Sequence, residues 1–594
     1  MMRSLLREHR HSLIDCAKAA LLVGFVVGCS PTTTPTPAAS PTAAPTPTAQ
    51  PPIAVKVWVT KADQSKLLEA QPDISFAAAA QGDTVVDVNE NNRYQQMDGF
   101  GGAMTDSSAW LLYTQMPEAQ RKDLMSKLFS RTDGIGVSML RVPMGASDLV
   151  HGPAYTYDDM PAGQADPTLA HFSIEHDMAY IIPALQDAFK LNPDLKIVAN
   201  PWSPPAWMKT TDLLGNGTLL PQYYAAWAQY FVKFVQAYKA QGVPVWSVTM
   251  QNEPHYEPGS YPGMRLEPAD EATLAKTYLA PALKAAGLDT KIMVWDHNWD
   301  NTSYAIDVLA DPAAKAVVAG TAWHCYAGSF FAQGVVHDAY PDMPMWETEC
   351  SGFTSLGFGD GFKNDMSDLM IGSTRYWAKS IIKWPMVTNT TNGPNTGGCG
   401  TCIGFATIDP SAPAGYTYTR DYFSIGQVSK FVRSGAYRIA SSGFTFHGFG
   451  TVAFKNPDGS KVLVVNNPFN YDSNILVHWG DRSFAYSVPA QAAATFTWSG
   501  TQEDVAAPTQ PTNMTQKVNS TKVDLKWDFS ALADTYTVKR SATAGGPYTV
   551  VAAGVGLPEY FDTTAVSGTK YYYVVSAINK LGESPNSAEA TAAP

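Results

Sequence analysis

Short apolar runs alternate with longer amphipathic segments through the middle of the chain. The apolar runs have the length and β-branched content of strands, and the segments between them have helical periodicity. We predict strands at 99–104, 136–142, 196–201, 245–252, 291–296, 320–326, 344–349 and 381–387. Helical patterns cover 117–129, 174–189, 222–241 and 268–286. Eight strands, each followed by a crossover, predict a (β/α)8 TIM barrel over residues 97–420, an α/β fold.

An open, doubly wound sheet is the rival fold. That fold usually carries a glycine-rich phosphate loop of GxGxxG spacing after its first strand. The first predicted strand contains Gly99-Phe100-Gly101-Gly102, which lacks this spacing. The barrel is therefore the preferred prediction.

Both flanks of the barrel read as strands. Residues 53–96 and 421–500 contain short alternating apolar runs, and we expect them to pair into one side β-sandwich. After a break at 503–511, evenly spaced strand patterns predict a separate all-β domain over 507–594. With Gly545-Gly546-Pro547-Tyr548 and the run 579–584, this last segment resembles a bacterial fibronectin type III module.

The first residues predict export. Three arginines precede an apolar run at 19–28, about half the length that spans a bilayer. The run ends at Cys29, and the sequence there resembles a bacterial lipobox, which predicts a lipoprotein signal peptide at 1–28 and lipidation of Cys29. Residues 29–52 are rich in Pro and Thr, which favours an extended tether. We expect a bacterial lipoprotein at the cell envelope or outer surface, or a secreted protein, whose only membrane contact is the lipid anchor.

The composition bears on which classes of ligand the protein can bind. The net charge of −12 argues against nucleic acid, because phosphate recognition needs clustered Lys and Arg. The 15 Trp and 28 Tyr allow stacking on sugars, although most such rings are expected to fill cores. His255, His324 and His337 lack metal-ligand spacing, so we predict no metal and no cofactor.

Four cysteines lie outside the predicted signal peptide and anchor: Cys325, Cys350, Cys399 and Cys402. The pair Cys399-Gly-Thr-Cys402 fits half a zinc site, a redox motif or a local disulfide. Structural zinc needs four ligands and the sequence has no second CxxC, so we predict a Cys399–Cys402 disulfide. The remaining two cysteines are either a second pair or two buried thiols.

Two glutamates end predicted barrel strands. Glu253, followed by Pro254, ends the fourth strand, and Glu349 ends the seventh. In a TIM barrel functional groups gather at the C-terminal ends of strands, so both carboxylates should face one cleft. A carboxylate pair is what retaining glycoside hydrolysis requires, with the two groups about 5 Å apart. The alternative is that either glutamate only pairs with a barrel arginine such as Arg141.

Glu347 competes with Glu349 for the second position. Strand alternation places both side chains on the same face, so parity does not separate them. Glu349 lies nearer the C-terminal rim. We therefore predict Glu349 as the functional group and Glu347 as a buried, hydrogen-bonded support.

Several motifs, in the right order between residues 53 and 500, resemble glycoside hydrolase family 30, nearest to its glucosylceramidase-like and β-1,6-glucanase branches. They are Gly99-Phe100-Gly101-Gly102-Ala103-Met104-Thr105-Asp106, Arg141-Val142-Pro143-Met144, the run 201–209, Gln251-Asn252-Glu253-Pro254, His324-Cys325-Tyr326, Thr348-Glu349-Cys350 and Gly435-Ala436-Tyr437-Arg438-Ile439. Cys325 departs from the pattern, because an aromatic residue is expected between His324 and Tyr326. The segment Met386-Val387-Thr388-Asn389 departs as well, where relatives tend to read Asn-Leu-Ala-Leu.

The resemblance implies roles for single residues. Glu253 would be the acid/base with a raised pKa, and Glu349 the ionised nucleophile. Asn252 would bind the 2-hydroxyl of the sugar in the −1 subsite. Further substrate-binding positions are Arg141 below the carboxylates, Asp148 and Trp202 at the outer hydroxyls, His324, Tyr326 beside the nucleophile, and Trp384 at the pocket wall.

These expectations combine into one function. We predict a monomeric retaining β-glycoside hydrolase that acts on β-linked glucosides, such as β-1,6-glucan or glucosylceramide-like substrates. A xylan-active family member is the alternative within the enzymes. A non-catalytic surface glycan-binding protein is the alternative outside them.

Overall fold

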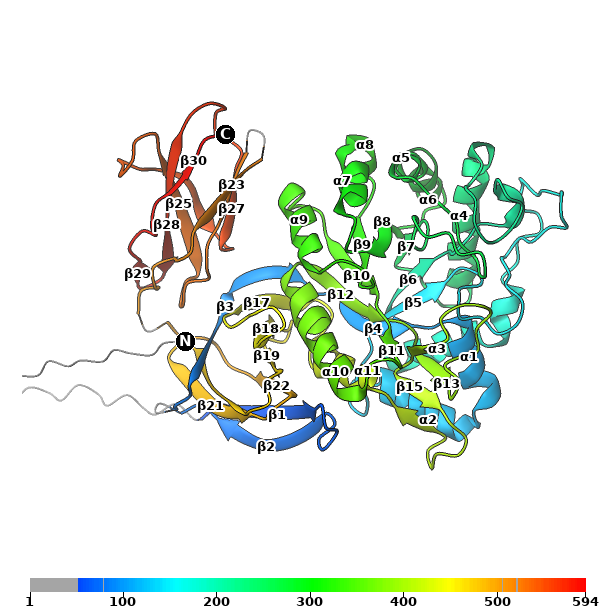
Figure 1. Cartoon of the computed structure of the whole chain (residues 1–594), viewed down its shortest axis with the longest axis horizontal. Coiled ribbons are helices and arrows are strands. Elements are labelled where there is room, and N and C mark those ends of the chain that lie inside the picture. The colour runs from blue at the N-terminus through cyan, green and yellow to red at the C-terminus, as the bar shows by residue number, and fades with distance from the viewer. Residues whose placement is uncertain (1–51, 78–79, 505, 520–521) are drawn as a thin grey trace, which may run out of the picture. The chain divides into compact units, whose positions relative to one another are not determined.

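The computed structural model describes residues 52–77, 80–504, 506–519 and 522–594 (Figure 1). The predicted signal peptide, Cys29 and all of the tether but Pro52 lie outside the described residues. In the part of the chain that is described, no helix combines the length and the apolar character needed to cross a membrane.

Eight parallel strands close into a barrel, which confirms the predicted fold class. Along the chain they are β4 (Gly99–Ala103), β5 (Met139–Pro143), β6 (Lys196–Asn200), β7 (Ser247–Thr249), β8 (Lys291–Asn298), β9 (Gly320–His324), β10 (Met345–Glu349) and β12 (Ala378–Lys383). Each strand pairs with the next, and β12 closes the barrel against β4 with Ser380 opposite Gly99. Met139, Met293 and Trp346 fill the interior as part of one buried cluster.

Two predicted strands were wrong at their ends. The eighth runs over Ala378–Lys383, and Val387 begins a separate strand, β13 (Val387–Asn389). Pro385, which has no N–H to donate, separates the two. The fourth strand is only Ser247–Thr249, so Glu253 lies beyond the strand on a loop.

Helices surround the barrel (Figure 1). They are α1 (Asp106–Trp110), η1 (Leu111–Gln115), α2 (Glu118–Phe129), η2 (Glu175–Ala179), α3 (Ile181–Leu191), η3 (Ala206–Met208), η4 (Pro221–Tyr223), α4 (Tyr224–Ala240), α5 (Pro268–Thr273), η5 (Leu274–Leu279), α6 (Ala280–Ala285), α7 (Thr302–Ala310), α8 (Pro312–Lys315), α9 (Phe331–Ala339), α10 (Phe358–Asn364), η6 (Asp365–Ser373) and α11 (Arg420–Ser429). In α4, the side chains of Trp227, Phe231 and Phe234 are buried in the main hydrophobic cluster. The barrel is thus held by an apolar layer between strands and helices.

The strands of the two flanks form one mostly antiparallel sheet, as their patterns predicted, but the predicted flank 421–500 was wrong at its start, where α11 (Arg420–Ser429) is a helix. The order of the sheet is β2 (Glu69–Ser75), β1 (Ala54–Lys61), β22 (Ala492–Trp498), β19 (Lys461–Asn467), β18 (Gly450–Lys455), β17 (Tyr437–Ser441), β3 (Thr84–Gln96), β20 (Ser473–Trp479) and β21 (Arg482–Val488). The rings of Phe484 in β21 and Phe496 in β22 lie 5.3 Å apart although their strands are far apart in that order. The sheet therefore folds over on itself into a sandwich with its own core.

The last described segment is a separate all-β unit. One sheet has the order β23 (Thr515–Asn519), β24 (Lys522–Lys526), β27 (Glu559–Asp562). The other has the order β26 (Thr549–Val555), β25 (Thr535–Ser541), β28 (Tyr571–Asn579), β29 (Gly582–Glu583), and β30 (Ala590–Ala592) pairs with β28. Trp527, Tyr536 and Tyr573 are buried in a core of their own.

Short strands follow the ends of the last two barrel strands. They are β11 (Gly352–Phe353), paired with β14 (Cys402–Ile403), and a sheet of β13, β15 (Ala406–Ile408) and β16 (Tyr416–Tyr418). Phe353 and Cys402, which pair in this arrangement, both line the cavity described next.

Candidate active site

A cavity of about 300 Å³ opens at the C-terminal ends of the barrel strands. Its lining is Asp148, Trp202, Asn252, Glu253, Tyr256, Tyr261, Tyr326, Glu349, Phe353, Trp384, Cys399 and Cys402. Both predicted catalytic glutamates are in this set, together with most of the predicted substrate-binding residues. Arg141 and His324 lie fully buried in contact with the two glutamates.

Glu253 is held in a left-handed turn. Its φ is 46°, a conformation that residues with a side chain adopt rarely and at a cost. Its N–H donates to the carbonyl of Asp296 (3.0 Å), and its carbonyl accepts from the N–H of Tyr256 (2.8 Å). These two bonds fix the turn and direct the carboxyl group into the cavity.

Glu349 is held through both carboxylate oxygens. Oε1 accepts from the hydroxyl of Tyr326 (2.8 Å), and Oε2 accepts from Nη1 of Arg141. The residue is only 6% exposed. One carboxylate oxygen of Glu349 lies within 4.8 Å of one of Glu253. The structure thus brings the two predicted carboxyl groups together in one pocket.

Arg141 connects the base of the site. Besides Glu349, its guanidinium donates from Nη2 to Asn252 Oδ1 (2.8 Å) and to Asp296 Oδ2 (2.7 Å). Its carbon centre lies 5.0 Å from the ring of Trp202. A rigid guanidinium fork fully buried among these acceptors fixes their relative positions, which agrees with the predicted orienting role.

Asp296 is a residue that sequence reasoning missed. It accepts from the hydroxyls of Thr249 (2.7 Å) and Thr348 (2.6 Å) as well as from Arg141. Burial opposes its ionisation, but the charges of Arg141 and His324 prevail and lower its pKa well below the ordinary range. The rule that selected Glu253 and Glu349 would also have found it, because Asp296 ends the predicted fifth strand.

His324 lies between two carboxyl groups. Nδ1 is 3.1 Å from Glu253 Oε1, and Nε2 is 3.1 Å from Asp296 Oδ1. Burial lowers the pKa of the imidazole, but the charges of Glu349 and Asp296 outweigh it and raise the pKa to about 10. Glu253, His324 and Glu349 each bring one polar atom to within 4.8 Å of the others.

The pKa directions of the two glutamates are opposite to our expectation. Burial raises the pKa of Glu253, but the hydrogen bond and charge of His324 outweigh it and leave the pKa lowered. Burial also raises the pKa of Glu349, and Arg141 and His324 offset this only in part. The expected order was wrong because it did not include His324 against Glu253. The two carboxyls titrate as a pair.

The predicted sugar-binding residues surround the pair. Trp202 and Trp384 are both buried and lie 5.1 Å apart between ring centres. Asp148 accepts from the backbone N–H of Cys399 (3.2 Å) through Oδ2. Burial and then the charge of Glu349 raise the pKa of Asp148 to about 7. A carboxyl group whose pKa lies near 7 can donate a hydrogen bond to a sugar hydroxyl when it is protonated and accept one when it is ionised.

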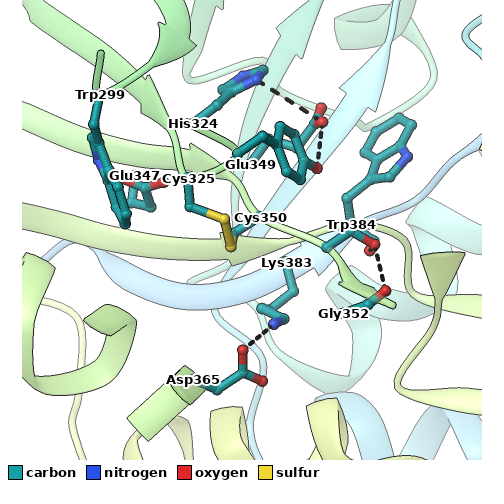
Figure 2. The surroundings of a disulfide bond; sticks show 12 residues. Trp299, His324, Cys325, Glu347, Glu349, Cys350, Gly352, Asp365, Lys383 and Trp384 are labelled. Carbon is teal, nitrogen blue, oxygen red and sulfur yellow. Dashed lines mark hydrogen bonds and ion pairs between the residues drawn. A yellow bond between two sulfur atoms is a disulfide. The ribbon is translucent and has the colours of Figure 1, made fainter. Parts of the chain in front are cut away.

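Glu347 does not share a face with Glu349, contrary to the prediction from strand alternation. The pairing of β10 with β9 shifts register between Glu347 and Glu349, so simple alternation does not hold there. Glu347 is buried and accepts from the indole N–H of Trp299 (2.9 Å) and from the amide of Gln333 on α9 (3.2 Å). Figure 2 shows Trp299 beside Glu347, apart from Glu349. Glu347 is a hydrogen-bonded support, as predicted, but on the helix side of its strand.

Both cysteine pairs are bonded. The Cys399–Cys402 disulfide is present, and its two residues line the cavity beside Asp148. Cys325 and Cys350 form a second disulfide, which settles the alternative that the sequence left open. The second bond lies next to Glu349 in the chain (Figure 2).

Three aromatic residues of the lining were also missed: Tyr256, Tyr261 and Phe353. Tyr256 and Phe353 closely follow the two glutamates in sequence, which is the signal that could have found them. His297, directly after the predicted fifth strand, is buried with Nε2 4.0 Å from Glu253 Oε1. Burial lowers the pKa of His297 to about 4, so it is neutral beside Glu253.

Comparison with known proteins agrees with this geometry. The glycosyl hydrolase family 30 TIM-barrel domain matches residues 97–432, and the β-sandwich domain of the same family matches residues 435–496. An endo-1,6-β-D-glucanase of Aspergillus fumigatus is 36% identical over 435 residues, which are 69% of this chain and 86% of that protein. A lysosomal acid glucosylceramidase of Mus musculus is 30% identical over 68% of this chain and 82% of that protein.

A solved structure shares the arrangement. An endo-β1,6-glucanase superposes with a TM-score of 0.71 at 33% sequence identity, covering 75% of this chain and 99% of its own. The barrel and the β-sandwich domain that follows it are therefore features of one family. The chain belongs to glycosyl hydrolase family 30 and is a glycoside hydrolase.

Proposed function

We propose that this enzyme is a retaining β-glycoside hydrolase that works by double displacement through Glu253 and Glu349. The observation that carries the proposal is the approach of the two carboxylates to within 4.8 Å. Retaining enzymes need about 5 Å between the groups, whereas inverting enzymes need roughly 6.5–9.5 Å to admit a water molecule. The spacing supports direct attack by a carboxylate on the sugar.

In the first step Glu349 attacks the anomeric carbon and Glu253 gives its proton to the glycosidic oxygen as the bond to the leaving group breaks. In the second step Glu253 removes a proton from water, which attacks the same carbon and releases Glu349. The contacts of Arg141 and Tyr326 keep the attacking carboxylate in one orientation. The reactive form of the pair carries its single proton on Glu253. Because the pKa of Glu253 is lowered and that of Glu349 is raised, this is the less populated of the two singly protonated forms.

The substrate we propose is a β-linked glucan with 1,6 linkages. Three endo-1,6-β-D-glucanases are 34–36% identical to this chain over 83–86% of their own length. Glucosylceramidases are 29–32% identical, which makes a glucosylceramide-like lipid the second candidate. In the pocket Asn252 would bind the 2-hydroxyl, and Asp148 with the two tryptophans would hold the outer hydroxyls.

Product analysis tests both parts of this proposal. The enzyme is incubated with β-1,6-glucan, β-1,3-glucan, xylan and glucosylceramide, and the first-formed anomer is followed by proton NMR. We expect β-1,6-glucan to be cleaved fastest and the β anomer to appear first. An α anomer as first product would contradict the mechanism, and preference for xylan would contradict the substrate.

The nucleophile has its own test. Glu349→Gln keeps the size of the side chain but not its charge, so turnover should be abolished while the melting temperature stays near that of the parent. Glu347→Gln is the matched comparison, because Glu347 lies two residues earlier on the same strand and its side chain faces the helices. Near-normal hydrolysis by Glu349→Gln would overturn its assignment.

We further propose that residues 1–28 direct export, that Cys29 carries a lipid anchor, and that residues 507–594 are a fibronectin type III module. Two facing sheets with a buried Trp527 support the last assignment, since that architecture is typical of such modules. Incorporation of a labelled fatty acid, lost in Cys29→Ser, tests the anchor. Label retained in that variant would exclude Cys29 as the attachment point.

A further inference from the structure

The Cys325–Cys350 disulfide connects two residues that directly neighbour the catalytic groups. Cys325 stands between His324 and Tyr326 in the chain, and Cys350 directly follows Glu349. Their Cα atoms lie 5.3 Å apart. Figure 2 shows the bond with His324 and Glu349 on adjoining strands.

The bond lies where the pairing of the two strands ends. The register of β9 and β10 shifts after Glu347, and His324 opposite Glu349 is the last pair. The disulfide joins the residues immediately beyond this pair. The carbonyl of Cys350 also accepts from the N–H of Trp384 (3.1 Å), at the end of β12. The ends of three neighbouring barrel strands are thus connected at this point.

The disulfide lies outside the pocket. Cys350 is 4% exposed and belongs to the main hydrophobic cluster, against which the half-buried Cys325 packs. Neither residue is part of the cavity lining. On the pocket side, Oε1 of Glu349 accepts from Tyr326 (2.8 Å) and lies 3.9 Å from Nδ1 of His324. Any effect of the bond on the reaction therefore passes through these neighbours.

We propose that the Cys325–Cys350 disulfide is a positioning element of the active site, which fixes the strand end that carries His324 and Tyr326 against the strand end that carries Glu349. The inference rests on the proposed role of Glu349 as nucleophile. Without the bond, the strand end of Tyr326 would lose its covalent link to the strand end of Glu349. It would keep the last pair of the ladder and the hydrogen bond from the N–H of Tyr326 to Asn298 Oδ1 (3.0 Å). A displacement of about 1 Å in such a contact can cost on the order of a hundredfold in rate.

Selective reduction tests the proposal. The background is Cys399→Ser/Cys402→Ser, so that a dithiol in excess acts on one disulfide of the barrel. The dithiol gives two electrons and two protons to the bond, which becomes two thiols, while the dithiol becomes its own disulfide. We expect kcat to fall about tenfold to a hundredfold with KM within about twofold, and to recover on reoxidation.

The pH profile separates positioning from a merely structural role. The hydrogen bond from Tyr326 lowers the pKa of Glu349, which is the higher pKa of the pair, so its loss should move the alkaline limb of kcat/KM to higher pH. Cys325→Ser/Cys350→Ser in the same background should show the kinetics of the reduced enzyme and no response to dithiol. If either the reduced enzyme or the Cys325→Ser/Cys350→Ser variant unfolds, the other still tests the proposal. Circular dichroism checks that each is folded, and thiol titration checks that the bond is reduced.

A reduced or substituted enzyme that melts at lower temperature yet keeps its kcat and alkaline limb would overturn the proposal, because the bond would then be structural only. The proposed function fails in a different way. If Glu349→Gln remains active with the disulfide intact, the nucleophile is wrongly assigned whatever reduction does.

Discussion

His324 lies against Glu253, with Nδ1 of the imidazole 3.1 Å from Oε1 of the carboxylate. The pKa of His324 is raised to about 10, so the ring is a cation across the neutral range. Its charge lowers the pKa of Glu253 and opposes the rise in the pKa of Glu349. A single residue therefore influences both titrations that the reaction depends on.

Replacing His324 with glutamine should move the whole pH profile. Without the cation, the pKa of both glutamates rises. Glu349 then needs a higher pH to ionise, and Glu253 keeps its proton to a higher pH. Both limbs of the bell-shaped plot of kcat/KM should shift to higher pH, with a lower maximum. His447→Gln, at an exposed histidine outside the cavity lining, should leave the profile unchanged. Limbs that stay in place, or move to lower pH, would show that His324 does not control the pair.

Removing the proposed acid should make the rate depend on the leaving group. We expect Glu253→Ala to lose about 10²–10⁴-fold in kcat on glucan, because the glycosidic oxygen must leave without a proton. On aryl glucosides whose leaving phenols are acidic, the loss in kcat should be far smaller. The measurement is kcat/KM against the pKa of the leaving phenol. Equal losses on all substrates would argue that Glu253 is not the proton donor.

Tyr256 should contribute to binding of the leaving-group sugar. It is 48% exposed, lines the cavity and is hydrogen-bonded through its backbone to Glu253, the side from which the leaving group departs. Loss of an aromatic contact of about 1 kcal/mol should raise KM roughly fivefold for gluco-oligosaccharides in Tyr256→Ala. Tyr256→Phe keeps the ring and should stay near the parent. A small alkyl glucoside should respond little to either change. An equal rise in KM for that substrate would place Tyr256 elsewhere in the site.

Glu271 should make stability fall as pH rises. It is fully buried and accepts from the backbone N–H of Trp295 (3.2 Å), behind the strand that carries Asp296. Burial raises its pKa to about 8, so the folded protein holds a proton that the unfolded chain releases near pH 4.5. Its contribution is present below pH 4.5 and is lost as pH rises toward 8, at up to about 1.4 kcal/mol per pH unit.

The matched variant for this prediction is Glu271→Gln, which keeps an acceptor and does not titrate. The free energy of unfolding is measured by urea titration between pH 4.5 and 8. The value for the variant minus that for the parent should become more positive as pH rises. Parallel curves for the two proteins would mean that Glu271 is ionised in the fold or has an ordinary pKa.

The sequence patterns located the barrel well and the ends of its strands less well. All eight strands were found, because each is an apolar run separated from the next by a helical period. The fourth was drawn through Asn252, although its ladder ends at Thr249. Met250 continues the apolar pattern past the last ladder bond there, and hydrophobic pattern does not reveal where hydrogen bonding stops.

The site was predicted where a motif or a strand end marked it. Glu253 and Glu349 follow from the position of active sites in such barrels, and the structure brings them together. The failure at Glu347 has a local cause, a register shift that breaks alternation and that residue types do not mark. The pKa order failed for a related reason, since it depends on His324, which reaches Glu253 only once the barrel is closed.

The flanking sandwich has a consequence for how the chain is made. In this sheet Lys56 pairs with Thr497 and Val88 with Ser441, so strands that leave the ribosome first have partners that leave it after the whole barrel. Such distant pairings form slowly and leave unpaired strand edges exposed in the meantime. We infer that β1, although it can pair with β2 at once, lacks its other partner β22 throughout synthesis of the barrel, and that β3 lacks both β17 and β20. The sandwich is therefore completed only after the barrel has been made.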